Sequence, residues 1–159
     1  MKKLLLCAFL ALPILSTQLS ASPAHKVSRP KLHPKVPAKV NWRTSFPLAL
    51  AEAKRTGKPV FVDFFTTWCG PCKYLDSVTY KDYRFVTESR KWVMVKVDAE
   101  KNSANVKLAQ KFKVDGFPSL IFFKPSGKES GRVVGGYPPE MLVPKMKKAG
   151  IIASGGTRI

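Results

Sequence analysis

Short runs of apolar residues, each bounded by glycine, proline or polar residues, dominate the hydrophobic pattern of this chain. The three clearest runs cover residues 60–65, 92–98 and 120–123. Apolar runs of this length with such boundaries are typical of buried strands. The turn residues at 125–128 predict that a fourth strand follows over 132–134.

Helical patterns fill the intervals between these runs, and residues 40–42 are compatible with a short edge strand. The predicted helices cover 45–56, 71–77, 82–90, 103–112 and 138–149. In the last helix we expect Met141, Leu142 and Met146 to face inward and Gly150 to end the helix. Alternation of helices and strands followed by a terminal hairpin predicts an α/β fold, with a mixed central β-sheet flanked by helices on both faces.

The first 24 residues have the pattern of a secretory signal peptide. Lys2 and Lys3 precede an apolar run over 4–15, and small residues follow as far as Ala24. The apolar run is short for a membrane span, although an uncleaved anchor is the alternative interpretation. We therefore expect export, to the periplasm, with cleavage after Ala21 or Ala24.

Basic residues far outnumber acidic ones, and the formal net charge is +18. Residues 25–40 combine lysine and arginine with several prolines, which predicts an extended leader or tether. A folded domain over 41–149 and a flexible tail over 150–159 complete the predicted organisation. The simplest interpretation of the excess positive charge is that the basic side chains are exposed to solvent and keep the protein soluble. The basic segment is also suited to contact with an anionic membrane surface. Because we expect export, we expect no nucleic acid as a partner.

Residues 68–72 read Trp-Cys-Gly-Pro-Cys and carry the clearest chemical signal. Cys69 is predicted at a helix N-terminus, where unpaired N–H groups and the helix dipole stabilise a thiolate, so Cys69 is the expected nucleophile. Cys72 lies almost one turn further on and is expected to resolve a mixed disulfide by attacking Cys69. Gly70 permits the tight approach of the two cysteines, and Pro71 fixes the backbone between them.

The alternative for these cysteines is half of a zinc site. Structural zinc needs about four ligands. The only other cysteine is Cys7, inside the predicted signal peptide, and the two histidines are His25 and His33 in the proline-rich segment. We therefore expect a redox disulfide between Cys69 and Cys72, no metal and no cofactor.

Two charged residues interrupt the predicted buried strands. Asp63 shares a strand face with Phe61 and Phe65, so its carboxyl group should be buried, and burial raises the pKa of a carboxyl group. A raised pKa suits proton exchange with the resolving thiol. Lys96 interrupts the neighbouring strand and is the candidate partner of Asp63. The alternative is that both side chains are exposed at a sheet edge.

Further residues are candidates for contact with a substrate. Proline is awkward at the start of a central strand, and a cis Phe117–Pro118 bond would account for Pro118. Such a turn leaves backbone groups of Phe117 available to an extended peptide. Gly135 and Gly136 would allow a substrate chain to approach closely, and an ordinary turn is the alternative. Trp68 covers the site, and a partly buried aromatic side chain is the alternative.

The chain resembles the thioredoxin family in four stretches that occur in the family order. They are Val62–Lys73, Val95–Asp98, Gly116–Leu120 and Val134–Gly136. The resemblance spans about residues 40–149 and is strongest to an exported branch that includes the periplasmic C-terminal domain of the thiol:disulfide interchange protein DsbD. It implies a thioredoxin fold.

The resemblance also implies roles for individual residues. Cys69 would attack, Cys72 would resolve, Asp63 and Lys96 would assist proton movement, and Pro118 would be cis. Phe65 stands where many family members carry tryptophan, and Thr67 where some carry an acid, so the resemblance does not define the redox potential.

These observations predict an exported thiol:disulfide oxidoreductase that reduces or exchanges protein disulfides. Its partners would be protein disulfides and a membrane or exported electron donor of the thioredoxin system, and we expect a monomer. A thiol oxidant or a disulfide isomerase of the same fold is the alternative, because the motif does not define the direction of electron flow. A peptide-binding module without catalysis is a third interpretation, against which the intact cysteines argue.

Overall fold

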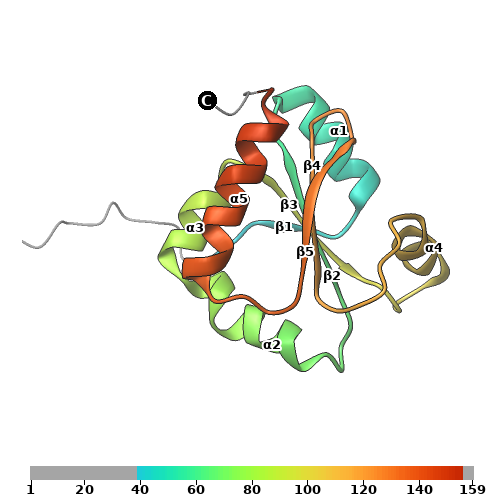
Figure 1. The fold of residues 1–159 in the computed structure, drawn as a ribbon. Helices are drawn as coiled ribbons and strands as arrows, with labels where there is room; N and C mark the ends of the chain where they lie inside the picture. The colour runs from blue at the N-terminus through green and yellow to red at the C-terminus, as the bar shows by residue number, and fades with distance from the viewer. Residues whose placement is uncertain (1–38, 156–159) are drawn as a thin grey trace, which may run out of the picture. The chain divides into compact units, whose positions relative to one another are not determined.

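The computed structural model describes residues 39–155 (Figure 1). The predicted signal peptide, nearly all of the predicted leader and residues 156–159 lie outside this range. The elements follow the predicted alternation. They are β1 (Trp42–Arg43), α1 (Phe46–Thr56), β2 (Val60–Phe65), α2 (Gly70–Ser77), η1 (Thr79–Lys81), α3 (Tyr83–Ser89), β3 (Val93–Asp98), α4 (Ser103–Lys111), β4 (Ser119–Phe123), β5 (Glu129–Val134) and α5 (Pro139–Ala153).

The five strands form one mixed sheet in the order β1-β3-β2-β4-β5. Strand β3 pairs in parallel with both β1 and β2, whereas β4 pairs antiparallel with β2 and with β5. The predicted α/β architecture is therefore confirmed, and so is the edge position of the first short strand. In the parallel pair, Asp63 of β2 stands opposite Lys96 of β3.

Helices α1 and α4 cover one face of the sheet (Figure 1). Alternate residues of each strand point into this face. Those of β2 and β3 are apolar, and β4 adds the buried Ser119 beside Ile121 and Phe123. The buried side chains of this face include Val60, Val62 and Phe64 of β2 together with Phe46 of α1 and Phe123 of β4.

Helices α2, α3 and α5 cover the opposite face (Figure 1). Phe61, Met94, Leu120 and Phe122 point into this layer from the sheet, and Tyr80 of the short helix η1 is buried with them. The same face carries the charged side chains of β2 and β3, since residues two apart in a strand share a face.

The predicted end of the last helix at Gly150 is wrong, because α5 continues to Ala153. Glycine serves close packing at this position: a Cβ atom on Gly150 would lie 3.2 Å from the ring of Trp92. The predicted inward orientation is right for Leu142 and Met146, which are fully buried, and wrong for Met141, which is half exposed.

Within residues 39–155, none of the helices has the length and apolar character needed to cross a membrane.

Candidate active site

Cys69 and Cys72 form a disulfide at the start of α2, where Cys69 occupies the N-cap position. Their Cα atoms are 5.3 Å apart, and the backbone N–H of Cys72 donates to Sγ of Cys69 at 3.1 Å. The helix begins here because Pro71 lies in its first turn, where a missing N–H is tolerated. Both cysteines are only 3% exposed. A sulfur at this N-cap lies at the positive end of the helix dipole.

Two loops from the far end of the chain pack against this motif. A Cβ atom on Gly136 would lie 2.9 Å from the carbonyl oxygen of Pro71, so only glycine fits here without a shift of the backbone. The neighbouring Gly135 has φ +110° and donates its N–H to the carbonyl oxygen of Pro118 at 2.9 Å. The Phe117–Pro118 bond is cis, as the sequence predicts.

Trp68 lies beside these loops and is 64% exposed. Its indole N–H donates to a carboxylate oxygen of Glu100 at 2.9 Å, and its ring meets Phe117 edge-on with 6.0 Å between centroids. The sequence-predicted substrate contacts Trp68, Gly70, Pro71, Phe117, Pro118 and Gly135 thus fall in one neighbourhood. A Cβ atom on Gly70 would meet no atom within 4 Å, so the start of α2 is open.

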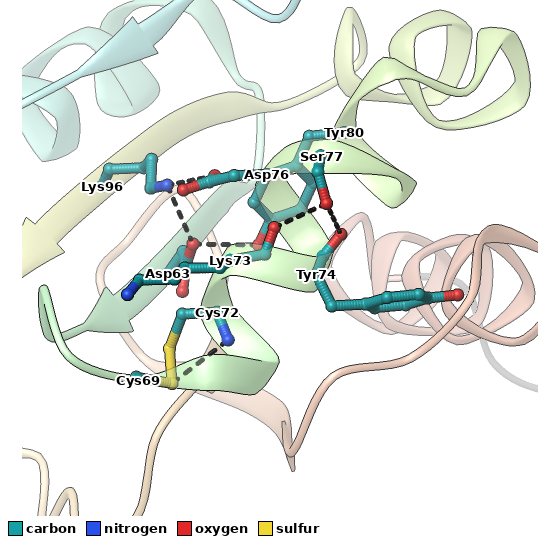
Figure 2. Close-up of polar contacts among 9 residues, drawn as sticks. All are labelled: Asp63, Cys69, Cys72, Lys73, Tyr74, Asp76, Ser77, Tyr80 and Lys96. Carbon is teal, nitrogen blue, oxygen red and sulfur yellow. Dashed lines mark hydrogen bonds and ion pairs between the residues drawn. A yellow bond between two sulfur atoms is a disulfide. The ribbon is translucent and has the colours of Figure 1, made fainter.

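Asp63 is buried beneath the cysteines, with 1% of its surface exposed. Figure 2 shows its side chain between Cys72 on one side and Lys96 and Tyr80 on the other. Burial raises the pKa of the Asp63 carboxyl group to about 6, partly offset by the charge of Lys96 and by a hydrogen bond from Tyr80. Its Oδ1 atom has no hydrogen-bond partner among the described residues. The carboxyl group therefore titrates near pH 6, well above the range of an exposed aspartate.

The direct hydrogen bond to Asp63 comes from Tyr80, whose hydroxyl group donates to Oδ2 at 2.9 Å (Figure 2). Tyr80 is 5% exposed. Burial and the neighbouring carboxylate raise its pKa well above the usual value, so the phenol keeps its proton.

Lys96 lies further from Asp63 than the strand register suggests. Its Nζ is 3.8 Å from Oδ2 of Asp63 but makes a short ion pair with Oδ1 of Asp76 in α2. The ammonium group also lies 4.6 Å from the ring centroid of Phe65. The exposed fractions of the side chains rise from 1% for Asp63 to 17% for Lys96 and 49% for Asp76. A chain of charges thus leads from the buried carboxyl group to solvent.

No group of three or more histidine, cysteine, aspartate or glutamate side chains suited to a metal ion occurs between residues 39 and 155.

Comparison with known proteins assigns the fold to a family. The thioredoxin-like domain family matches residues 46–150. The chain belongs to the thioredoxin family. A thiol:disulfide interchange protein DsbD from Campylobacter jejuni (strain RM1221) is 35% identical over 97 residues, which are 60% of this chain and 17% of that protein. The chain thus spans about a sixth of the length of this relative.

Two further proteins are similar to this chain over most of their own length. A thioredoxin H-type protein from Oryza sativa subsp. indica is 30% identical over 115 residues, covering 70% of this chain and 86% of that protein. The solved structure of DsbH oxidoreductase superposes with a TM-score of 0.63 at 26% identity, covering 77% of this chain and 94% of that one. The thioredoxin fold predicted from the sequence is confirmed.

Within this thioredoxin-family site, Asp76 and Tyr80 are not among the residues predicted from the sequence. For Asp76 a signal was available: Cys72 and Asp76 are spaced four apart within the predicted helix, and residues four apart share a helix face. Tyr80 lies in the 3₁₀ turn η1, after α2 has ended at Ser77, so its direction does not follow from that spacing.

Gly136 was predicted, with Gly135, to allow a substrate chain to approach closely, but the backbone that approaches Gly136 in the structure is that of Pro71.

Proposed function

We propose that this protein is an exported thiol:disulfide oxidoreductase that reduces protein disulfides through Cys69 and Cys72. The observation that carries the proposal is the bridged cysteine pair at the N-terminus of α2, above a buried carboxyl group. The DsbD relative, named a thiol:disulfide interchange protein, supports the same chemistry.

The reduced protein begins the reaction with the thiolate of Cys69. This sulfur attacks one sulfur of the substrate disulfide, a mixed disulfide forms, and the other substrate sulfur leaves as a thiolate. Cys72 then loses its proton and attacks Sγ of Cys69, which releases the second substrate sulfur. The substrate has gained two electrons, and the protein is left with the Cys69–Cys72 disulfide.

Asp63 is the proposed acceptor of the Cys72 proton. Its carboxyl group has a pKa raised to about 6, so it is mainly ionised at neutral pH yet basic enough to take up a proton. In this proposal the ammonium group of Lys96 favours the ionised form of the carboxyl group. The proton then passes to solvent on the side where Lys96 and Asp76 become exposed.

The substrate would lie over the rim formed by Trp68, Gly70, Pro71, Phe117, Pro118 and Gly135. Trp68 offers an exposed aromatic surface, and the turn at Pro118 offers backbone groups to an extended segment. A site of this kind suits a disulfide in a polypeptide, because the contacts come from backbone and one large side chain.

Each turnover leaves the pair oxidised, so the proposal includes an electron donor. We assign this role to a membrane or exported component of the thioredoxin system, which would return two electrons to the disulfide. The protein would act as a monomer, and the basic segment 25–40 would contact an anionic membrane surface.

Single-turnover reduction of an insulin disulfide tests the reaction. The reduced full-length protein should yield two insulin thiols per molecule. Cys69→Ala should lose at least about a thousandfold in rate, because no thiolate remains at the helix start to attack. Cys72→Ser should release one thiol and then accumulate a mixed disulfide with insulin, detectable by mass spectrometry.

Cys7→Ser is the matched control, since it removes a cysteine outside the proposed pair and should leave the rate unchanged. If Cys72→Ser formed no mixed disulfide while wild-type protein bound insulin, the site would be a peptide-binding surface. Equilibration of the pair with glutathione gives the direction: a potential near −270 mV, the value typical of thioredoxin, supports reduction, and one near about −120 mV supports oxidation.

Export is tested separately by fusing residues 1–24 to a reporter enzyme that is active only outside the cytoplasm. We expect activity with the natural segment and none after Lys2 and Lys3 are replaced by glutamate, because the basic start is required for insertion.

A further inference from the structure

The hydroxyl group of Tyr80 is buried and directed at the proposed proton acceptor. It reaches Asp63 from η1, 17 residues further along the chain, and donates to Oδ2 at 2.9 Å. The ring is fixed on several sides, with centroids 4.9 Å from Trp42 and 4.8 Å from Phe85. Because the ring cannot turn away without disturbing these contacts, the hydroxyl group is held in place.

We propose that Tyr80 is a positioning residue for Asp63, and that its hydroxyl group occupies Oδ2 so that Oδ1 is the oxygen that exchanges a proton with Cys72. The inference rests on the proposed function of the site. It assigns a role to a side chain outside the cysteine motif.

The two carboxylate oxygens have different surroundings, and this difference supports the assignment. Oδ2 accepts the Tyr80 hydrogen bond and lies 3.8 Å from Nζ of Lys96, whereas Oδ1 is buried without a partner in the described part of the chain. A proton added to Asp63 therefore binds Oδ1, since Oδ2 already receives a hydrogen. Figure 2 shows Asp63 lying between Tyr80 and Cys72. Oδ2 accepts the hydrogen bond from Tyr80, which leaves Oδ1 for Cys72.

Lys96 cannot provide the same orientation, because its ammonium group is engaged by Asp76. A charge at 3.8 Å acts on both oxygens, while a hydrogen bond selects one of them. The ionisable groups around Asp63 are Lys96 from β3, Asp76 and Cys72 from α2, and Tyr80 from η1. On the β4 side the residue opposite Asp63 is the apolar Leu120.

The hydrogen bond from Tyr80 favours the ionised carboxyl group, so its loss should raise the pKa of Asp63. Tyr80→Phe removes the hydroxyl group and keeps the ring. A hydrogen bond to a charged group is strong enough that the midpoint should rise by roughly one pH unit. Tyr74→Phe is the matched control, because it makes the same chemical change on an exposed side chain of α2.

The first measurement follows the ¹³C signal of the Asp63 carboxyl group with pH in the oxidised protein, where neither Cys69 nor Cys72 titrates. We expect a midpoint near 6 in wild type and in Tyr74→Phe, and one near 7 in Tyr80→Phe. In wild type alone, the ¹³Cζ signal of Tyr80 should move with the same midpoint as Asp63, because the two groups share a hydrogen bond. This second signal does not depend on whether the variant folds.

The second measurement uses a chromogenic aromatic disulfide, which releases one coloured thiol on attack by Cys69 and another when Cys72 resolves the intermediate. In Tyr80→Phe the second phase should be about twofold slower at pH 7 and unchanged above about pH 9, following the ionised fraction of Asp63. In an Asp63→Asn background, adding Tyr80→Phe should leave the pH profile of that phase unmoved.

Equal Asp63 midpoints in wild type and Tyr80→Phe would overturn the inference, and so would a rate loss of the same size at every pH, which is the mark of a merely structural role. A wild-type protein that releases no coloured thiol would instead contradict the proposed function. The ¹³C titration remains informative in that event, so the two failures are distinguishable.

Discussion

The two faces of the sheet are built from the same strands but differ in what they bury. Beneath α1 and α4, alternate residues of β2 and β3 are all apolar, from Val60 and Val62 to Val95 and Val97. Beneath α2, α3 and α5, the positions between them place Asp63 and Lys96 among aromatic rings. One face is a hydrophobic core, and the other includes a titrating group.

The two faces contribute differently to the free energy of folding. Apolar burial stabilises the first face at every pH, whereas an ionised carboxylate in the second face is costly unless it is compensated. The structure compensates Asp63 only in part, with one hydrogen bond and a cation at 3.8 Å. Its pKa therefore stays above the ordinary value, and stability on this side depends on pH.

The largest expected effect comes from truncating the apolar face. Phe123 is fully buried, with ring centroids 5.2 Å from Phe46 and 4.9 Å from Phe112. Phe123→Ala should lower the free energy of unfolding by about 3 to 5 kcal/mol, through lost burial and the cavity that remains. Urea denaturation at pH 5 and pH 8 should give the same loss.

Leu48→Ala is the control for that measurement, because Leu48 is 72% exposed on α1 and should change stability by less than about 0.5 kcal/mol. If the loss of unfolding free energy in Phe123→Ala varied with pH, the expectation that the apolar face stabilises the fold equally at every pH would be contradicted.

The next largest effect is an increase in stability, and it comes from a substitution on the charged face. The folded protein holds a proton on Asp63 up to about pH 6, and the unfolded chain only to about pH 4, so stability is lost as the pH rises between these values. Asp63→Asn abolishes that loss. The variant should be roughly 2 to 3 kcal/mol more stable than wild type at pH 8 and nearly equal to it at pH 3.5.

Thermal unfolding of both proteins across this pH range checks the expectation. The variant should also resolve mixed disulfides more slowly near neutral pH, which links lower stability in wild type to a faster reaction. Parallel stability curves from pH 3.5 to pH 8 would show that Asp63 has an ordinary pKa.

The smallest effect is expected from Lys96→Met, which keeps much of the length of the side chain and removes its charge. The charge of Lys96 lowers the pKa of Asp63, so the variant should titrate above about 6, by roughly one pH unit more. In pH-dependent denaturation, the pH at which stability stops falling should move upward by the same amount. An unchanged dependence of stability on pH would mean that Lys96 interacts with Asp76 and does not affect the pKa of Asp63.

Local patterns were enough to predict the fold and the position of the cysteines. Bounded apolar runs gave the strands, and Pro71 after Cys69 gave the start of α2. An aspartate inside an apolar run favoured burial over an exposed sheet edge, because Asp63 shares its strand face with Phe61 and Phe65, and the structure confirms the burial.

Contacts between distant segments were harder to predict. Tyr80 falls between the predicted helices 71–77 and 82–90, and the sequence does not say that a short 3₁₀ turn aims its hydroxyl group at Asp63. Lys96 was paired with Asp63 from their strands, but the shorter contact is with Asp76 on a helix. In α5, glycine was interpreted as a stop, because local propensity does not reveal the ring of Trp92 against Gly150.

The placement of Asp63 opposite Lys96 also bears on how the strands find their alignment. If β3 slipped by one residue against β2, every side chain on it would change sides, and the ammonium group would enter the layer of valines and phenylalanines beneath α1 and α4. An unpaired cation there costs several kcal/mol. The charged pair therefore disfavours a register shift of one residue between β2 and β3. Two uniformly apolar strands would not resist such a shift in this way.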